Sequence, residues 1–205
     1  MLLWLSEHVG GPSALILLGA VLSAIGALWA SVEQTRFERE LRVKSDQLAE
    51  LNREIADSVI GGDSFCYLTV ASLSDQSNRG VLTVVHQGKY PLYDAHARVV
   101  DLQKFDAIKD SPTLENILTA ETSLSLGTLI KGHASMLGRW DLGTGDARGF
   151  NIFFSARNGS WYQNLRFRRV GGIWLFANRV VRSEQTVFED IQPGYPRDSS
   201  GHVKW

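Results

Sequence analysis

The feature that most constrains this chain is a long apolar segment near its N-terminus. Residues 12–32 read PSALILLGAVLSAIGALWASV, and no charged residue occurs between His8 and Glu33. A helix needs about 20 mainly apolar residues to cross the hydrocarbon core of a bilayer, and this segment supplies them. Trp4 and Trp29 bracket it, as expected for aromatic side chains at the two membrane interfaces. The sequence therefore predicts one transmembrane helix over 12–32.

A short interfacial segment over 1–11 is expected before the span, because Gly10, Gly11 and Pro12 break the chain there. The alternative is a cleaved signal peptide, but signal peptides begin with a positively charged region. This chain has no Lys or Arg before Arg36, so we expect the span to be retained. The residues that characterise the predicted span are Pro12, Leu17, Gly19, Ser23, Ala27 and Trp29.

The charges on either side of the span indicate its orientation. Glu7 is the charged residue of the N-terminal flank, whereas four basic residues follow the span closely: Arg36, Arg39, Arg42 and Lys44. The positive-inside rule then places the N-terminus outside and the rest of the chain in the cytoplasm, at a bacterial inner membrane. The lone Cys66 is consistent with a reducing compartment. The alternative is a soluble domain that faces the periplasm.

Residues 33–60 are predicted to continue the helix as a coiled-coil stalk. No Pro or Gly occurs there, and the spacing of the apolar residues alternates between four and three, with Lys44 at the single polar position of the seam. Small residues at Gly19, Ser23 and Ala27 also permit close helix approach inside the membrane. We therefore expect a parallel homo-oligomer, most simply a homodimer, although a single helix folded back on the soluble domain is the alternative. The seam residues are Phe37, Leu41, Leu48, Leu51 and Ile55.

After Gly61 and Gly62, which are expected to end the helix, the hydrophobic period changes to two. Strands are predicted at 64–71, 81–86, 93–102, 124–130, 133–142, 149–157, 160–170 and 173–182, with one short helix or a loop over 106–120. The Asn158-Gly159 and Gly171-Gly172 turns make the last three strands a meander. Some 7–8 short strands favour a mainly β domain over 63–182, an antiparallel β-sandwich.

Five aromatic residues are expected to form the core of this domain: Phe153, Trp161, Phe167, Trp174 and Phe176. The tail over 183–205 contains Pro193, Gly194, Pro196 and Ser199-Ser200-Gly201 and is predicted to be disordered.

Two parts of the sequence resemble known proteins. Residues 88–102 (GKYPLYDAHARVVDL), together with Leu126-Gly127-Thr128-Leu129 and Lys131-Gly132-His133, resemble bacterial immunoglobulin-like modules. Residues 41–68 are similar to a set of bacterial single-pass membrane proteins with a coiled-coil stalk and a C-terminal immunoglobulin-like β-sandwich. The resemblance implies that fold and layout, and it implies no activity.

The sequence offers no catalytic constellation, metal site or cofactor motif. Its five histidines form neither an HxH nor an HExxH pattern, and it contains no GxSxG or phosphate loop. Cys66 lies in an apolar strand, where a buried, inert thiol is expected, and His96 is expected to face solvent. Asp101, Asp106 and Asp110 are interpreted as a solvated loop. The net charge of −1 argues against a nucleic-acid partner.

One local group of charges suggests binding: Arg166, Arg168, Arg179 and Arg182, which the alternation of two neighbouring strands indicates as a cationic patch. The patch is interpreted either as a solvated face or as a site for phosphate, a lipid headgroup or an acidic partner. The sequence as a whole favours a non-catalytic, membrane-anchored scaffold with an unknown protein partner. A membrane-tethered ligand sensor that signals through the coil and a periplasm-facing envelope or secretion component are the alternatives.

Overall fold

The computed structural model describes residues 12–71 and 78–205. The predicted interfacial segment over 1–11 therefore lies outside the described residues. The chain has two compact units, 1–54 and 55–205, so that the last six residues of the long helix belong with the β domain.

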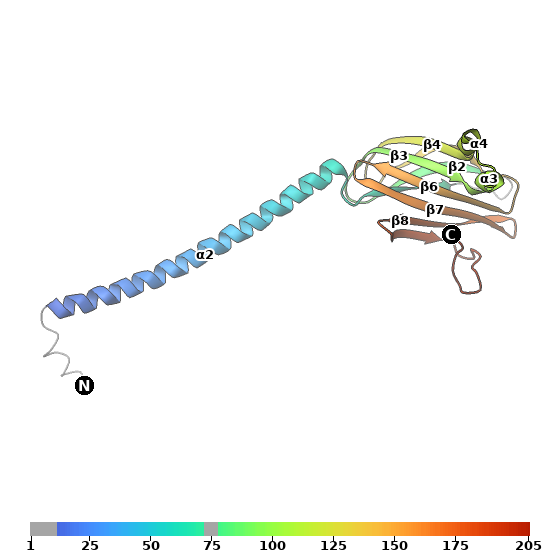
Figure 1. The fold of residues 1–205 in the computed structure, drawn as a ribbon. Helices are drawn as coiled ribbons and strands as arrows, with labels where there is room; N and C mark the ends of the chain where they lie inside the picture. The colour runs from blue at the N-terminus through green and yellow to red at the C-terminus, as the bar shows by residue number, and fades with distance from the viewer. Residues whose placement is uncertain (1–11, 72–77) are drawn as a thin grey trace. The chain divides into compact units, whose positions relative to one another are not determined.

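The described residues of the first unit, 12–54, belong to one uninterrupted helix, α2 (Pro12–Ile60), of 49 residues (Figure 1). The predicted span and the predicted stalk are thus one continuous helix. The helix ends where the sequence predicts, because Gly61 and Gly62 both have positive φ angles, of 104° and 51°. The N–H of Gly61 still donates to the carbonyl of Asp57 at 2.8 Å, which closes the last turn before the chain leaves the helix.

The second unit is mostly β, with two antiparallel sheets (Figure 1). The three-stranded sheet has the order β1-β2-β5, and the six-stranded sheet has the order β4-β3-β6-β7-β8-β9. The strands are β1 (Phe65–Ala71), β2 (Arg79–Gln87), β3 (Leu92–Asp101), β4 (Glu121–Leu129), β5 (Ala134–Asp141), β6 (Ala147–Ala156), β7 (Gly159–Val170), β8 (Ile173–Arg182) and β9 (Gln185–Ile191).

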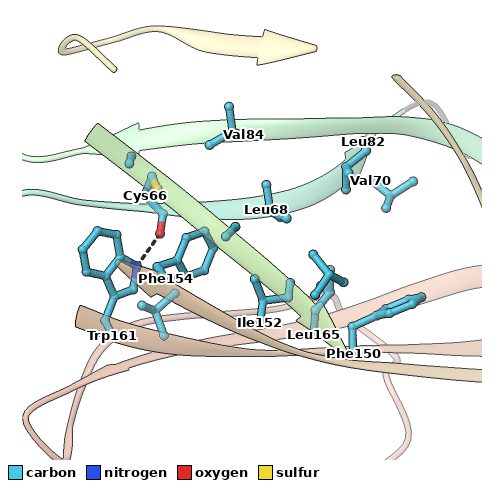
Figure 2. Close-up of a cluster of buried hydrophobic side chains, with 14 of the residues drawn as sticks. Cys66, Leu68, Val70, Leu82, Val84, Phe150, Ile152, Phe154, Trp161 and Leu165 are labelled. Carbon is cyan, nitrogen blue, oxygen red and sulfur yellow. Dashed lines mark hydrogen bonds between the residues drawn. The ribbon is translucent and has the colours of Figure 1, made fainter. Parts of the chain in front are cut away.

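The inner faces of the two sheets share one hydrophobic core. Figure 2 shows Leu68 of the three-stranded sheet beside Ile152 and Phe154 of the six-stranded sheet, and Val84 belongs to the same cluster. Of the five aromatic residues expected in the core, Trp161, Phe167 and Trp174 are buried and Phe176 packs against them partly buried. Phe153 is a correction: its side chain is 41% exposed, because it lies on the opposite face of β6 from Ile152 and Phe154.

The free edge of β1 is satisfied by side chains of β7. The Gln163 amide oxygen accepts from the N–H of Leu68 at 2.8 Å, and its nitrogen donates to the carbonyl of Leu68 at 2.6 Å and to Oδ1 of Asn178 at 2.9 Å. Nε1 of Trp161 donates to the carbonyl of Cys66 at 2.8 Å, the dashed line in Figure 2. These bonds tie the two sheets together and occupy backbone groups of the β1 edge at Cys66 and Leu68.

Two sequence-based expectations about the end of β3 and the segment after it need correction. The segment after β3 contains α4 (Leu114–Ala120), which matches the short helix expected within 106–120, but a second helix, α3 (Leu102–Ile108), precedes it and was not expected. Asp101 is buried, not solvated, because its carboxylate accepts from the N–H groups of Gln103 and Lys104 and pairs with Arg148.

The predicted disordered tail over 183–205 is also wrong. It contains β9, and beyond that strand Tyr195 and Val203 are 7% exposed and pack against Ala177 on β8. Apolar contacts with the outer face of the six-stranded sheet thus order a segment whose composition is typical of disorder.

The β6–β7 turn holds the segment that follows the helix. Nδ2 of Asn158 lies within hydrogen-bond distance of the carbonyls of Gly61, Gly62 and Ser64, at 3.4, 3.0 and 2.7 Å. The same residue forms the predicted Asn158-Gly159 turn, in which Gly159 has a φ of 118°. The β6–β7 turn therefore fixes the connection between the end of the helix and the sheets of the β domain.

Candidate functional site

The helix carries the features from which the sequence predicts membrane attachment and oligomerisation. Within the described residues, it is the one helix long and apolar enough to cross a membrane, a property that a signal sequence near the N-terminus shares. The side chains of the predicted seam are exposed along it, by 51% to 62%: Phe37, Leu41, Leu48, Leu51 and Ile55. An exposed apolar seam on a polar helix is the surface that a partner helix buries.

Three of the four arginines in the predicted cationic patch share one face of the sheet. Arg166, Arg168 and Arg179 lie on the outer face of the six-stranded sheet, where Arg179 is opposite Asn164 in the β7–β8 register. Arg182 is a correction, since it lies over the ring of Trp161 at 5.8 Å and donates to the carbonyls of Ser64 and Asn158. It stabilises the junction with the helix and does not contribute to the outer face.

Arg166 is the unusual member of the group, because its side chain is buried at 9% exposure. Its guanidinium donates only to neutral oxygens: the carbonyls of Phe150 and Leu165 at 2.7 and 3.2 Å, and Oδ1 of Asn151 at 2.8 Å. Burial lowers the pKa of Arg166 to about 10; the phenol of Tyr195 opposes this shift and the neighbouring Arg179 adds to it. The group is therefore a largely desolvated cation that remains charged at neutral pH.

A polar network joins the two arginines across three strands. Nδ2 of Asn164 donates to Oδ1 of Asn151 at 3.0 Å, and Nη2 of Arg179 donates to Oδ1 of Asn164 at 3.1 Å. Nε of Arg179 is buried with no hydrogen-bond partner in the described part of the chain, and the ring of Trp205 lies 4.5 Å from its guanidinium. The network holds two positive charges and, among its described members, no carboxylate.

A pocket of about 240 Å³ opens beside Arg166 on this face. Its floor comes from β6 and β7 and includes Gly149, Arg166 and Arg168. One wall comes from α3, with Leu102, Gln103 and Asp106, and the other comes from the C-terminal segment, with Tyr195, Lys204 and Trp205. Gln103 is fixed by bonds with the carbonyl of Ala147 and the N–H of Gly149, both at 3.1 Å.

The other candidate residues are placed as structural groups. Cys66 is fully buried, as predicted, and burial raises the pKa of its thiol, which makes a nucleophilic role unfavourable. His96 is exposed, as predicted. In the described ranges, no group of three His, Cys, Asp or Glu residues lies close enough to hold a metal ion.

Sequence reasoning missed the residues of the pocket walls. Tyr195, Lys204 and Trp205 fell in the segment interpreted as disordered, and Gln103 directly followed the predicted strand over 93–102. The signal that was available is the apolar content of the tail, where Tyr195, Val203 and Trp205 recur among polar residues.

No protein-family model, curated protein or solved structure matches this chain.

Proposed function

We propose that the chain is a non-catalytic, membrane-anchored interaction protein, which presents its β domain on an oligomeric helical stalk. The observation that carries the proposal is the single helix Pro12–Ile60, whose N-terminal part has the length and hydropathy of a membrane span. The C-terminal part of the same helix bears the exposed seam. Membrane attachment and self-association are then properties of one continuous element.

The magnitude of seam burial supports an oligomer that depends on the membrane. Complete burial of a Leu, Ile or Phe side chain contributes about 1.5–3 kcal/mol, and the seam side chains are already partly shielded in one chain. Pairing two chains along the seam is therefore worth on the order of 10 kcal/mol gross, against an association cost of about 4–15 kcal/mol in solution. Tethering both chains in one membrane raises their effective concentration and shifts this balance toward the homodimer.

The strand order supports an immunoglobulin-like β-sandwich for β1–β7. β2 pairs with β5 in one sheet while β3 pairs with β6 in the other, so two pairs of strands interlock across the core, as in Greek-key sandwiches. β8 and β9 extend the larger sheet beyond that arrangement. Domains of this architecture commonly serve as docking modules, which agrees with a protein partner for this one.

The basic residues that follow the span support an inner-membrane location with the β domain in the cytoplasm. A fusion of alkaline phosphatase or a fluorescent protein after Trp205 tests this orientation. Cytoplasmic fluorescence without phosphatase activity is expected. Phosphatase activity without fluorescence would place the domain in the periplasm, as an envelope or secretion component.

The oligomeric state is tested by light scattering of the purified full chain in detergent. We expect the wild-type chain to be a dimer and Leu48→Asp to be a monomer, because a charge at the centre of the seam is buried on pairing. Ala49→Asp introduces the same charge one residue away, off the seam, and is expected to remain a dimer. A monomeric wild-type chain, or equal behaviour of the two variants, contradicts the proposal.

A ligand sensor that signals through the coil is the second candidate. The pocket of about 240 Å³ on the β domain favours it, since a sensor needs a ligand site. A ligand-dependent change in cross-linking of the seam would distinguish a sensor from a scaffold.

A further inference from the structure

We propose that the pocket between α3 and the C-terminal segment binds a phosphate monoester, with Arg166, Arg168 and Lys204 as its cationic ligands. This inference goes beyond the proposed function and does not depend on membrane attachment or on oligomerisation, because every residue it uses belongs to the β domain.

Arg166 has hydrogen-bond donors that no acceptor in the described part of the chain uses. A guanidinium has five N–H donors, and three hydrogen bonds to neutral acceptors are present. Nε–H and one N–H of Nη2 have no acceptor among the described residues. Because Arg166 lines the pocket, an oxyanion placed there meets donors that are already positioned.

The side chains that line the pocket carry an excess of positive charge. Arg148 is paired with Asp101, so that three cationic side chains, Arg166, Arg168 and Lys204, remain against one carboxylate side chain in the lining, Asp106. Asp106 itself lies 3.6 Å from the ammonium of Lys109. A phosphate monoester carries about −1.5 to −2 charges at pH 7 and three acceptor oxygens, which matches this excess better than a single carboxylate does.

The pocket has open space beside Arg166. A Cβ added at Gly149 would lie 3.1 Å from Cδ1 of Leu102 and 3.7 Å from Nε of Arg166, so glycine keeps this part of the floor open. A volume of about 240 Å³ exceeds what a phosphate group fills and leaves room for a small ester substituent. The ring of Trp205 and the phenol of Tyr195 border that space and offer apolar surface to the substituent.

Without a ligand, the buried positive charge of Arg166 is energetically unfavourable. Arg166 and Arg179 share a neutral amide network, and the charge of Arg179 lowers the stability of the charge on Arg166. A buried cation without a carboxylate partner is unfavourable. A bound dianion compensates it, which explains the arrangement as a binding site better than as a device for stability.

The test is calorimetric titration of the full chain in phosphatidylcholine nanodiscs. Glycerol phosphate is the soluble monoester, short-chain phosphatidic acid presents the same group as a lipid headgroup, and succinate is a dicarboxylate of comparable charge. We expect phosphate compounds to bind more tightly than succinate. The phosphate compound that binds more tightly identifies a metabolite or a lipid as the source of the group.

Variants locate the site. Arg168→Gln and Lys204→Gln remove exposed cations and are expected to weaken binding about ten-fold or more each, as for the loss of one charge-assisted hydrogen bond. Arg139→Gln, on β5 of the other sheet, removes the same charge away from the pocket and is expected to leave the affinity unchanged. Gly149→Ala narrows the floor and is expected to weaken binding without a change in net charge.

Three results would overturn the proposal: no binding of either phosphate compound, tighter binding of succinate, or equal loss of affinity in Arg139→Gln and Arg168→Gln. A dimeric chain that binds no phosphate refutes this inference alone. A monomeric chain that binds phosphate refutes only the proposed oligomer.

Discussion

Gln163 is expected to be a principal link between the two sheets. Its amide is fully buried and joins both peptide groups of Leu68 to Asn178. Replacement by Leu keeps a side chain of similar size and removes all three hydrogen bonds. The N–H and C=O of Leu68 and Oδ1 of Asn178 are then left buried without partners.

The expected loss of stability can be worked out from these three buried polar groups. Each buried polar group without a partner costs about 1–3 kcal/mol, and the added apolar surface of Leu returns about 1–2 kcal/mol. At about 1.5–2 kcal/mol per group, near the middle of that range, the three groups cost about 4.5–6 kcal/mol. After a return of about 1.5–2 kcal/mol from Leu, Gln163→Leu is expected to destabilise the β domain by about 3–4 kcal/mol.

The lone cysteine provides the assay, because Cys66 is fully buried in β1. Its thiol reacts with a reagent only after the domain opens, so the labelling rate reports the population of the open state. A loss of about 3–4 kcal/mol corresponds to labelling faster by a factor of about 10²–10³. Gln185→Leu, an exposed position on β9, is the matched control and should label at the wild-type rate. Labelling of Gln163→Leu at the wild-type rate would refute the assigned role of this amide.

Three further predictions concern other parts of the β domain. Asn158→Ala removes the bonds to three carbonyls after the helix, and amide exchange over 57–64 should accelerate by about ten-fold or more; unchanged exchange would show that the junction is held elsewhere. Asp101→Ala removes the cap of α3 and the partner of Arg148, and the urea midpoint should fall by an amount equivalent to about 1–3 kcal/mol, whereas Asp110→Ala, on an exposed residue, should leave it unchanged. Burial lowers the pKa of His86, while its bond with the carbonyl of Tyr90 opposes the shift, so the unfolded chain binds a proton at this site more readily than the folded one. The stability due to His86 is then complete above about pH 6.5 and is lost as the pH falls below that value; denaturation midpoints from pH 8 to pH 5 should fall less steeply in His86→Gln, and parallel curves would contradict this assignment.

Local signals predicted most of the fold. The glycine pairs at 61–62 and 171–172 and the Asn158-Gly159 turn marked the ends of elements correctly, because their glycines adopt the positive φ angles that those turns require. The β8–β9 turn gave no such signal. Ser183 and Glu184 have positive φ angles of 50° and 65°, a conformation uncommon for such residues, so β9 was missed and its segment was assigned to a disordered tail.

The pocket is the part that sequence periodicity does not reveal. Alternation along β7 placed Arg166 and Arg168 on one face, and the structure confirms that placement. Whether that face is covered depends on the segment 192–205, which packs on it from a distant part of the chain. Burial of Arg166 therefore depends on tertiary packing, which the alternation along one strand does not predict.

The central claim is that two anchored chains pair along the seam, and a cysteine scan in native membranes tests it most directly. Single cysteines at successive positions from 44 to 55, in a Cys66→Ala chain, are oxidised and the dimer fraction is measured. The account predicts maxima at Leu48→Cys, Leu51→Cys and Ile55→Cys, with a minimum at Arg53→Cys on the far side of the helix. Uniformly low cross-linking, or maxima without the alternation of three and four residues, would contradict it.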